Sequence, residues 1–145
     1  MATTQQYCTF TVDGLLVGIE VSRVQEIIRY QVTTPVPLAH PVVRGLINLR
    51  GQIVTALDLR QRLELPARHP DTLPTNVVVL TADGVVSFLV DEIGDVVEVD
   101  ETTFETPPET LRGIARDLIL GAHKLDARLL MVLDAERAAN LREVA

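Results

Sequence analysis

The chain has 145 residues, which fits one domain of ordinary size. A net charge of −7 and only 3% aromatic residues exclude the basic, base-stacking surface that binds nucleic acids. The single cysteine, Cys8, rules out an internal disulfide, and no Cys/His cluster has metal-ligand spacing, so we expect a cytoplasmic protein without a metal. The N-terminus has no signal-peptide pattern, and the longest uncharged run, 30–43, contains prolines and is too short for a spanning helix. We therefore expect neither export nor insertion into a membrane.

Short runs rich in Val and Ile dominate the chain, and they predict β-strands. The segments 10–21 and 76–90 each predict two strands joined by a tight turn, at Asp13-Gly14 and at Asp83-Gly84. Prolines in Thr34-Pro-Val-Pro37 and Thr106-Pro-Pro108 indicate connections, since proline cannot donate to a central ladder. The sequence predicts an all-β protein.

The two predicted hairpins belong to an internal repeat. Val17–Ile28 aligns with Val86–Val97, 69 positions later, and its apolar and acidic positions coincide with those of the second segment. Gly45–Arg62 aligns with Gly121–Ala138, 76 positions later, with Gly, Leu, Leu and Asp identical at matched places. The elements therefore follow one another in the same order in both halves, which predicts two similar small β-subdomains.

Helix signals are few. A short helix is predicted for 59–65 after Asp58 and a terminal helix for 135–144 after Asp134, because an aspartate before a helix caps its first amides. The proline-containing stretch 63–74 predicts an exposed loop that joins the halves. Neither half, roughly 7–65 and 75–140, would bury enough apolar surface alone. We therefore expect a single domain over 1–145, with short helices and an intertwined core shared by the halves.

The sequence contains no enzyme motif such as a Walker loop, His-Glu-x-x-His or Gly-x-Ser-x-Gly. Two related β halves with one aspartate each, Asp58 and Asp134, leave a hydrolase with paired aspartates as an alternative. Aspartic proteases have Asp-Thr-Gly or Asp-Ser-Gly there, whereas these two aspartates precede Leu-Arg and Ala-Glu and are better interpreted as helix caps. The three histidines are interpreted as solvent-facing or turn residues, and the acidic stretch 91–101 as the exposed face of a strand.

Two arginines, Arg44 and Arg50, flank the apolar run 45–49, so their guanidinium groups need partners. Glu26 is the nearest candidate by the logic of the repeat. A surface ion pair there would contribute only ~0–1 kcal/mol to stability.

Four segments of the first half have a recognisable order: Val21-Ser-Arg-Val-Gln-Glu-Ile-Ile28, Thr34-Pro-Val-Pro37, Val43-Arg-Gly-Leu-Ile-Asn-Leu-Arg-Gly-Gln-Ile-Val54 and Leu57-Asp-Leu-Arg60. The second half continues it with Val90-Asp-Glu-Ile-Gly-Asp-Val-Val97 and Leu129-Leu-Met-Val-Leu-Asp134. In order and spacing this chain resembles the chemotaxis coupling proteins of the CheW family from about Tyr7 to Asn140. It departs from that family at Thr55, where proline is frequent, and at the charged Asp134-Ala-Glu-Arg.

The resemblance implies two SH3-like five-stranded barrels side by side, a fold that the family shares with the regulatory domain of the histidine kinase CheA. It implies an adaptor, without catalysis or cofactor, that links this kinase domain to the cytoplasmic helical tips of chemoreceptors, the methyl-accepting chemotaxis proteins. Receptor helices would dock in an apolar groove between the barrels, beside a paired acid and arginine matched by Glu26 and Arg50. The other partner-binding positions would be Val24, Ile27, Arg44, Gly45, Asn48 and Leu49.

Two further functions stay open at this point. A similar adaptor could serve a non-flagellar chemosensory pathway that controls twitching, development or second-messenger synthesis, and the neighbouring genes would separate this from flagellar chemotaxis. The aspartate hydrolase would lose its activity when both aspartates are replaced by asparagine. We also expect the protein to be a monomer when it is alone.

Overall fold

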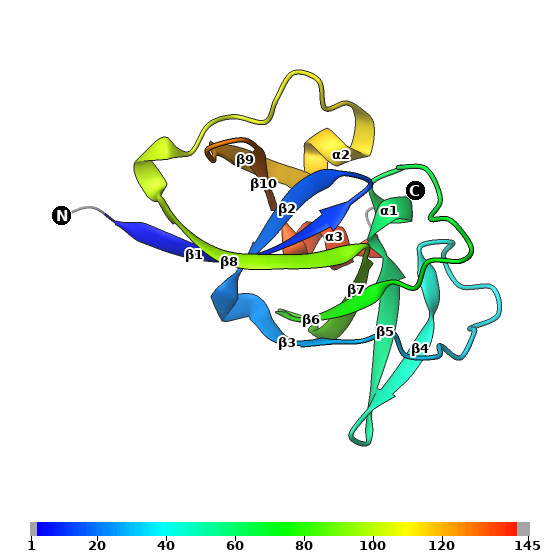
Figure 1. The fold of residues 1–145 in the computed structure, drawn as a ribbon. Coiled ribbons are helices and arrows are strands. Elements are labelled where there is room, and N and C mark those ends of the chain that lie inside the picture. The colour runs from blue at the N-terminus through cyan, green and yellow to red at the C-terminus, as the bar shows by residue number, and fades with distance from the viewer. Residues whose placement is uncertain (1–2, 142–145) are drawn as a thin grey trace.

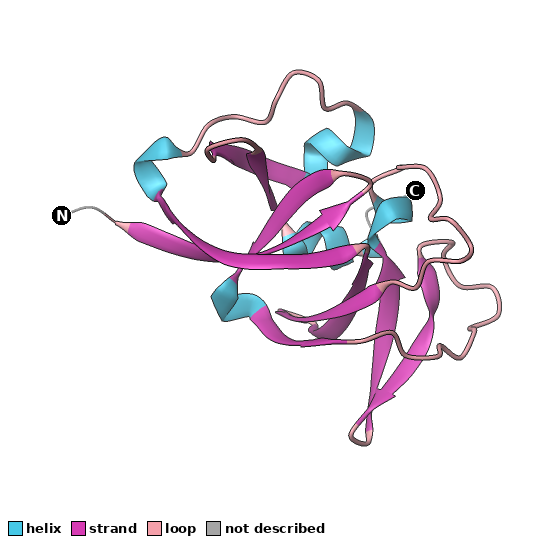
Figure 2. Ribbon diagram, in the orientation of Figure 1, coloured by secondary structure: helices cyan, strands magenta, loops and turns pink. Residues whose placement is uncertain are grey.

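The structure, a computed structural model, describes residues 3–141. Within this range the chain forms ten strands and three α-helices of four to six residues (Figures 1 and 2). The strands are β1 (Thr4–Val12), β2 (Leu15–Glu20), β3 (Val24–Ile28), β4 (Val43–Leu49), β5 (Gln52–Asp58), β6 (Thr75–Thr81), β7 (Gly84–Val90), β8 (Glu92–Asp100), β9 (Ile119–Lys124) and β10 (Leu129–Leu133). The helices are α1 (Leu59–Arg62), α2 (Gly113–Leu118) and α3 (Ala135–Ala139), and 3-10 turns cover Val21–Arg23 and Glu101–Thr103.

Both predicted hairpins are present, with β1 paired to β2 and β6 paired to β7. The first turn has positive φ at Asp13 (50°) and Gly14 (80°), as a two-residue hairpin turn requires. The second differs by one residue from the prediction. Its loop residues are Ala82 and Asp83, while Gly84 begins β7 with φ of 124°.

The strands form two five-stranded sheets, and each sheet contains strands from both halves of the sequence. Sheet A has the order β8-β1-β2-β10-β9, and sheet B has the order β3-β6-β7-β5-β4. In the repeat, β1 to β5 are equivalent to β6 to β10 in the same order. When each strand is replaced by its equivalent, the strand order of sheet A becomes that of sheet B. The two halves of the repeat therefore exchange their last three strands. This arrangement confirms the all-β prediction with two SH3-like five-stranded subdomains.

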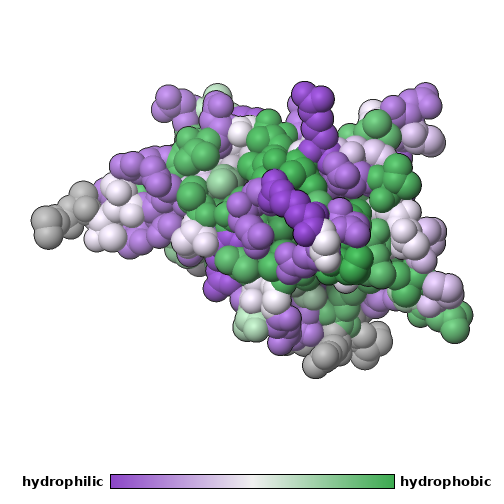
Figure 3. Space-filling model, turned by 90° about the horizontal axis from the view of Figure 1, so that it is seen from below, coloured by the Kyte–Doolittle hydropathy of each residue, from purple (hydrophilic) through white to green (hydrophobic). Residues whose placement is uncertain are grey.

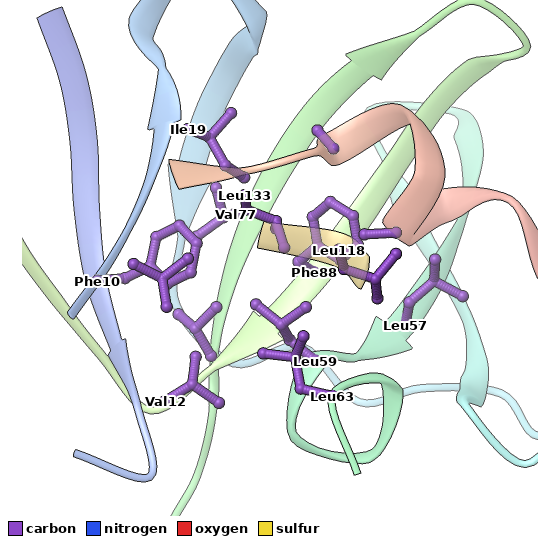
Figure 4. Packing of buried hydrophobic residues seen from close by; sticks show 14 of the residues in the cluster. Phe10, Val12, Ile19, Leu57, Leu59, Leu63, Val77, Phe88, Leu118 and Leu133 are labelled. Carbon is purple, nitrogen blue, oxygen red and sulfur yellow. The ribbon is translucent and has the colours of Figure 1, made fainter. Parts of the chain in front are cut away.

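The main hydrophobic cluster takes side chains from both sheets (Figure 4). Phe10 of β1 and Phe88 of β7 are fully buried in it, together with Leu59 of α1 and Leu118 of α2. Burial of a side chain of this size contributes about 1.5–3 kcal/mol. The cluster thus packs the strands of sheet A against those of sheet B.

The two aspartates before helices are N-caps, as predicted. The Asp58 side chain accepts a hydrogen bond from the backbone N–H of Arg60, and that of Asp134 from the backbone N–H of Arg137. Each helix is shorter than the sequence predicted. The first ends at Arg62, before a positive φ of 57° at Glu64, and the last ends at Ala139, with positions 142–144 outside the described residues. The sequence did not predict α2, because this helix starts at a glycine and has no side-chain cap.

An ion-pair network joins the sheets at one side of the core. Arg60 of α1 donates Nε to Asp91 Oδ1 (2.9 Å) and Nη2 to Asp91 Oδ2 (2.7 Å). Asp91 Oδ2 also accepts from the backbone N–H of Asp13 in the β1–β2 turn (2.7 Å). Burial raises the pKa of Asp91, but these hydrogen bonds outweigh that effect and hold its pKa below the ordinary value of 3.8. The prediction that the whole acidic stretch lies on an exposed strand face is therefore wrong for Asp91.

The repeat places a second network on the opposite side, with the charges reversed. Glu136, the equivalent of Arg60, accepts from Arg23 Nη1 (2.7 Å) and from the backbone N–H of Ala82 (2.9 Å). Ala82 stands 69 positions after Asp13, the donor of the first network. An ion pair thus lies at both junctions, although at the offset of 69 positions Arg23 corresponds to Glu92 and not to Asp91.

The histidine interpretation is confirmed at two positions and wrong at the third. His40 and His69 lie in turns, where each Nδ1 accepts a backbone N–H two residues later. His123 is buried in β9, within hydrogen-bonding distance of Thr103 Oγ1 (2.9 Å) and against the rings of Tyr7 and Phe104. Burial lowers its pKa below the ordinary value of 6.5, so the neutral imidazole is favoured.

The stretch 63–74 is the loop between the halves, as predicted, although it is not exposed throughout. Leu63 is buried in the core, and the Arg68 side chain is only 9% exposed. Within residues 3–141, no helix has the length and apolarity needed to cross a membrane.

Candidate functional site

The Glu26–Arg50 ion pair is the centre of the candidate site. Arg50 Nη1 donates to Glu26 Oε2 at 2.7 Å and Nη2 to Glu26 Oε1 at 3.2 Å, so the pair is bidentate. The Arg50 side chain is 80% exposed, whereas that of Glu26 is 21% exposed. Water screens a pair of this exposure, and its contribution to folding is therefore small. Among residues 3–141 no acceptor pairs with Nε of this guanidinium, so Nε can donate to another molecule.

Local structure fixes both charges. Arg50 (φ 52°) and Gly51 (φ 87°) form the tight turn between β4 and β5, and Asn48 Oδ1 accepts from the backbone N–H of Gly51 (2.9 Å). Glu26 lies in β3, which occupies the opposite edge of sheet B from β4. The ion pair therefore links the two edges of the curled sheet.

The equivalent corner of sheet A contains no such pair. Glu26 corresponds to Asp95 at the offset of 69 positions, and Arg50 corresponds to Asp126 at the offset of 76. Both aspartates are exposed and acidic, so they cannot attract each other. Sheet A nevertheless has the equivalent strand order, with each strand of sheet B replaced by its counterpart in the repeat. The fold thus forms without an ion pair at this corner.

Exposed apolar side chains lie on the same elements as the Glu26–Arg50 pair, β3 and the β4–β5 hairpin. Ile27 is 40% exposed and Ile53, which lies opposite Asn48 in the β4–β5 ladder, is 60% exposed. The face toward which the β4–β5 hairpin points has apolar side chains interspersed with hydrophilic ones (Figure 3). Sequence reasoning missed Ile53, although consecutive apolar residues directly after a turn, Ile53 and Val54, indicate that one of them points outward.

Two of the predicted positions contribute to the interior as well. Val24 packs against the main cluster, and Leu49 packs against a smaller one formed by Ile47, Val54, Ala56 and Leu89. Both side chains are half-buried. They connect the exposed corner to the core of the protein.

Gly45 and Arg44 lie apart from the ion pair. Gly45 is buried with φ of 150°, and a Cβ there would lie 2.5 Å from the backbone oxygen of Thr34. The missing side chain lets the connection before β4 pass close to the strand at Thr34. Arg44 is exposed at the other end of β4, about 20 Å of extended chain from Arg50. The structure therefore brings Glu26 and Arg50 into contact beside the turn that Asn48 holds, and it places Arg44 and Gly45 toward the other end of β4.

Two further observations bear on chemistry. Burial raises the pKa of the Cys8 thiol, which favours its unreactive protonated form. Among residues 3–141, no three His, Cys, Asp or Glu side chains gather closely enough to hold a metal ion. The candidate site is an exposed, charged and partly apolar corner.

The family model for the CheW-like domain matches residues 6–143. The chain belongs to the CheW family. Among curated proteins, the chemotaxis protein CheW of Bacillus subtilis is 34% identical over 137 residues, covering 92% of this chain and 85% of the relative. The CheW protein of Treponema pallidum is 28% identical over 143 residues, covering 96% and 84%. These shares show that the family match extends over nearly the whole chain.

A solved structure agrees with the fold. The crystal structure of the scaffolding protein TtCheW from Thermoanaerobacter tengcongensis superposes with a TM-score of 0.84 at 23% identity, covering 94% of this chain and 92% of the relative. At this identity the likeness concerns the fold. The arrangement of two five-stranded subdomains is therefore that of a CheW protein.

Proposed function

We propose that this CheW-family chain is a non-enzymatic adaptor in the cytoplasm. It couples the cytoplasmic tips of chemoreceptors, the methyl-accepting chemotaxis proteins, to the regulatory domain of a CheA-type histidine kinase in chemotaxis. It uses no cofactor. Family membership supports the general role, and curated relatives are named chemotaxis proteins.

The observation that carries the proposal for the site is the bidentate, largely exposed pair of Arg50 and Glu26. The equivalent corner of sheet A forms with two acidic residues, so the fold does not depend on such a pair. A fixed charge that folding does not need, on the same elements as the exposed Ile27 and Ile53, suits recognition of another protein. We assign partner contact to this corner through Val24, Glu26, Ile27, Asn48, Leu49 and Arg50. Arg44 and Gly45 complete the proposed surface at the other end of β4.

Arg50→Glu tests the assignment. We expect the melting temperature to stay nearly unchanged, because the pair is exposed, while binding weakens at least about tenfold, or ~1.4 kcal/mol. The measurement is calorimetric titration of the purified protein with the regulatory domain of a CheA-type kinase and, separately, with a receptor-tip fragment. Arg112→Glu is the matched control, since Arg112 is exposed and lies outside the proposed surface.

The swap of Glu26→Arg with Arg50→Glu separates direct contact from local shape. The swapped pair can form again with its polarity reversed, but it presents the wrong charge to a partner. Persistent loss of binding supports direct contact of both charges, whereas full recovery means that the pair only shapes the turn. Unchanged binding of Arg50→Glu to both partners would overturn the assignment of the site.

A further inference from the structure

A cavity of about 170 Å³ lies between the start of β4 and the linker 63–74. Cationic and hydroxyl side chains dominate its polar wall, and no Asp or Glu belongs to its lining among the described residues, although the chain has a net charge of −7. The polar side chains of this wall are Tyr30, Thr33, Arg44, Arg68, His69 and Thr72.

Arg68 is held in place from one side only. Its Nε donates to Asp91 Oδ1 at 3.2 Å. Its Nη2 is buried and donates no hydrogen bond within the described residues, although it lies 3.2 Å from Asp91 Oδ1 and 3.9 Å from Asp58 Oδ1. The side chain is only 9% exposed. Nη2 therefore lies beside these two carboxylates, and Arg68 takes part in the cavity as a buried cation whose charge they offset in part.

Arg44 supplies a second guanidinium to the same cavity. It is exposed, and it forms neither a hydrogen bond nor an ion pair with another described residue. The planar guanidinium presents several N–H donors in a fixed fork that matches the oxygens of phosphate and carboxylate. The nearby hydroxyls of Tyr30 and Thr33 add neutral donors.

The repeat shows that the fold does not require this charge. Arg44 corresponds to Leu120, 76 positions later, and Thr33 corresponds to Phe104, because each precedes the residue that bridges to its sheet, Thr34 to Leu46 and Glu105 to Ala122. Leu120 and Phe104 line a cavity of about 310 Å³ whose lining, among the described residues, contains two glutamates, Glu20 and Glu101, and no Lys or Arg. The same place in the fold thus has a cationic lining in one subdomain and a lining with acidic side chains in the other.

We propose that the cavity between Arg44 and Arg68 binds a small oxyanion, either free phosphate or a carboxylate. Asp58 and Asp91 lie beside Arg68 and offset part of its charge, and Asp58 lines an adjoining cavity together with both arginines. The exposed Arg44 therefore supplies much of the attraction. The proposal does not rest on the adaptor function, because it concerns the free protein.

The test is a titration of the full-length ¹⁵N-labelled protein with sodium phosphate at constant ionic strength, followed by NMR. The backbone amides of Thr33, Arg44 and 68–72 are expected to shift along a common saturating curve. Arg44→Gln should weaken the apparent affinity about tenfold, because it removes a charge-assisted hydrogen bond. Arg44→Lys should retain part of it, and the control Arg112→Gln should leave the curve unchanged.

A parallel titration with sodium acetate identifies the anion. Saturation at lower phosphate than acetate concentration assigns free phosphate, and the reverse order assigns a carboxylate; either result supports the site. Shifts that rise without saturation and scatter over all exposed arginines would overturn it, as would an unchanged curve in Arg44→Gln.

Discussion

Replacing Asp91 with asparagine is expected to lower the free energy of unfolding by about 2–4 kcal/mol at pH 7. The carboxylate accepts from two nitrogens of Arg60, from Arg68 and from the backbone of Asp13. Its own side chain is 18% exposed, and those of Arg60 and Arg68 are 15% and 9% exposed. Loss of the negative charge leaves two poorly solvated guanidiniums without their main partner. Urea denaturation of both proteins measures the difference.

The effect of Asp91→Asn should depend on pH in one direction. The pKa of Asp91 is lower in the folded protein than its ordinary value of 3.8, so the carboxylate adds stability above that value. This stability is lost as the pH falls through the folded pKa. The difference between the two proteins should thus be full at pH 7 and shrink below about pH 4. Glu92→Gln, the exposed neighbour, is the control, and an equal effect at both positions would contradict the network.

The sequence predicts structural features that depend on neighbouring residues better than features that depend on residues far apart in the chain. Local signals predicted the two hairpins and the two aspartate caps, because each depends on residues next to one another in the chain. The repeat predicted two equivalent units. It could not tell which strands pair, because a strand that joins the other sheet keeps the same local pattern.

Side chains that interact across the chain were the ones misjudged. Asp91 resembles its exposed acidic neighbours in sequence, and only the contact with Arg60 and Arg68 brings it into a half-buried network. His123 has an equally plain sequence context, and its burial depends on the segment that carries Thr103 and Phe104. In both cases the hydrogen-bond partner is 20 or more residues away.

The candidate site shows the same division. The repeat and the family resemblance together suggested Glu26 as the partner of Arg50, and the structure contains this pair. The same reasoning grouped Arg44 with Arg50, since both flank one apolar run. A seven-residue strand separates its two ends by about 20 Å, so the two arginines face different surroundings. Proximity in sequence thus overstated proximity in space.

Gly45→Ala is expected to lower the free energy of unfolding by about 3 kcal/mol or more. An alanine would have to adopt φ of 150°, which L-residues rarely do, and its Cβ would lie 2.5 Å from the backbone oxygen of Thr34. That oxygen accepts from the N–H of Leu46, and the N–H of Thr34 donates back to the Leu46 oxygen, both at 2.8 Å. Moving the connection aside would therefore break a pair of hydrogen bonds.

Alanine substitutions at two other glycines separate the effect of backbone strain from that of the steric clash. Gly84 has a similar φ of 124°, and no atom lies within 4 Å of the position that a Cβ would take there, so Gly84→Ala should cost only the strain, about 1–2 kcal/mol. Gly121, the repeat equivalent of Gly45, has no positive φ, but a Cβ there would overlap the Phe104 ring and the Glu105 oxygen. Denaturation of the three alanine variants should rank Gly45 as the most destabilising, with loss of amide-exchange protection at Leu46. A Gly45→Ala effect no larger than that of Gly84→Ala would show that the crossing connection yields freely, and that the close approach over β4 is not what requires glycine.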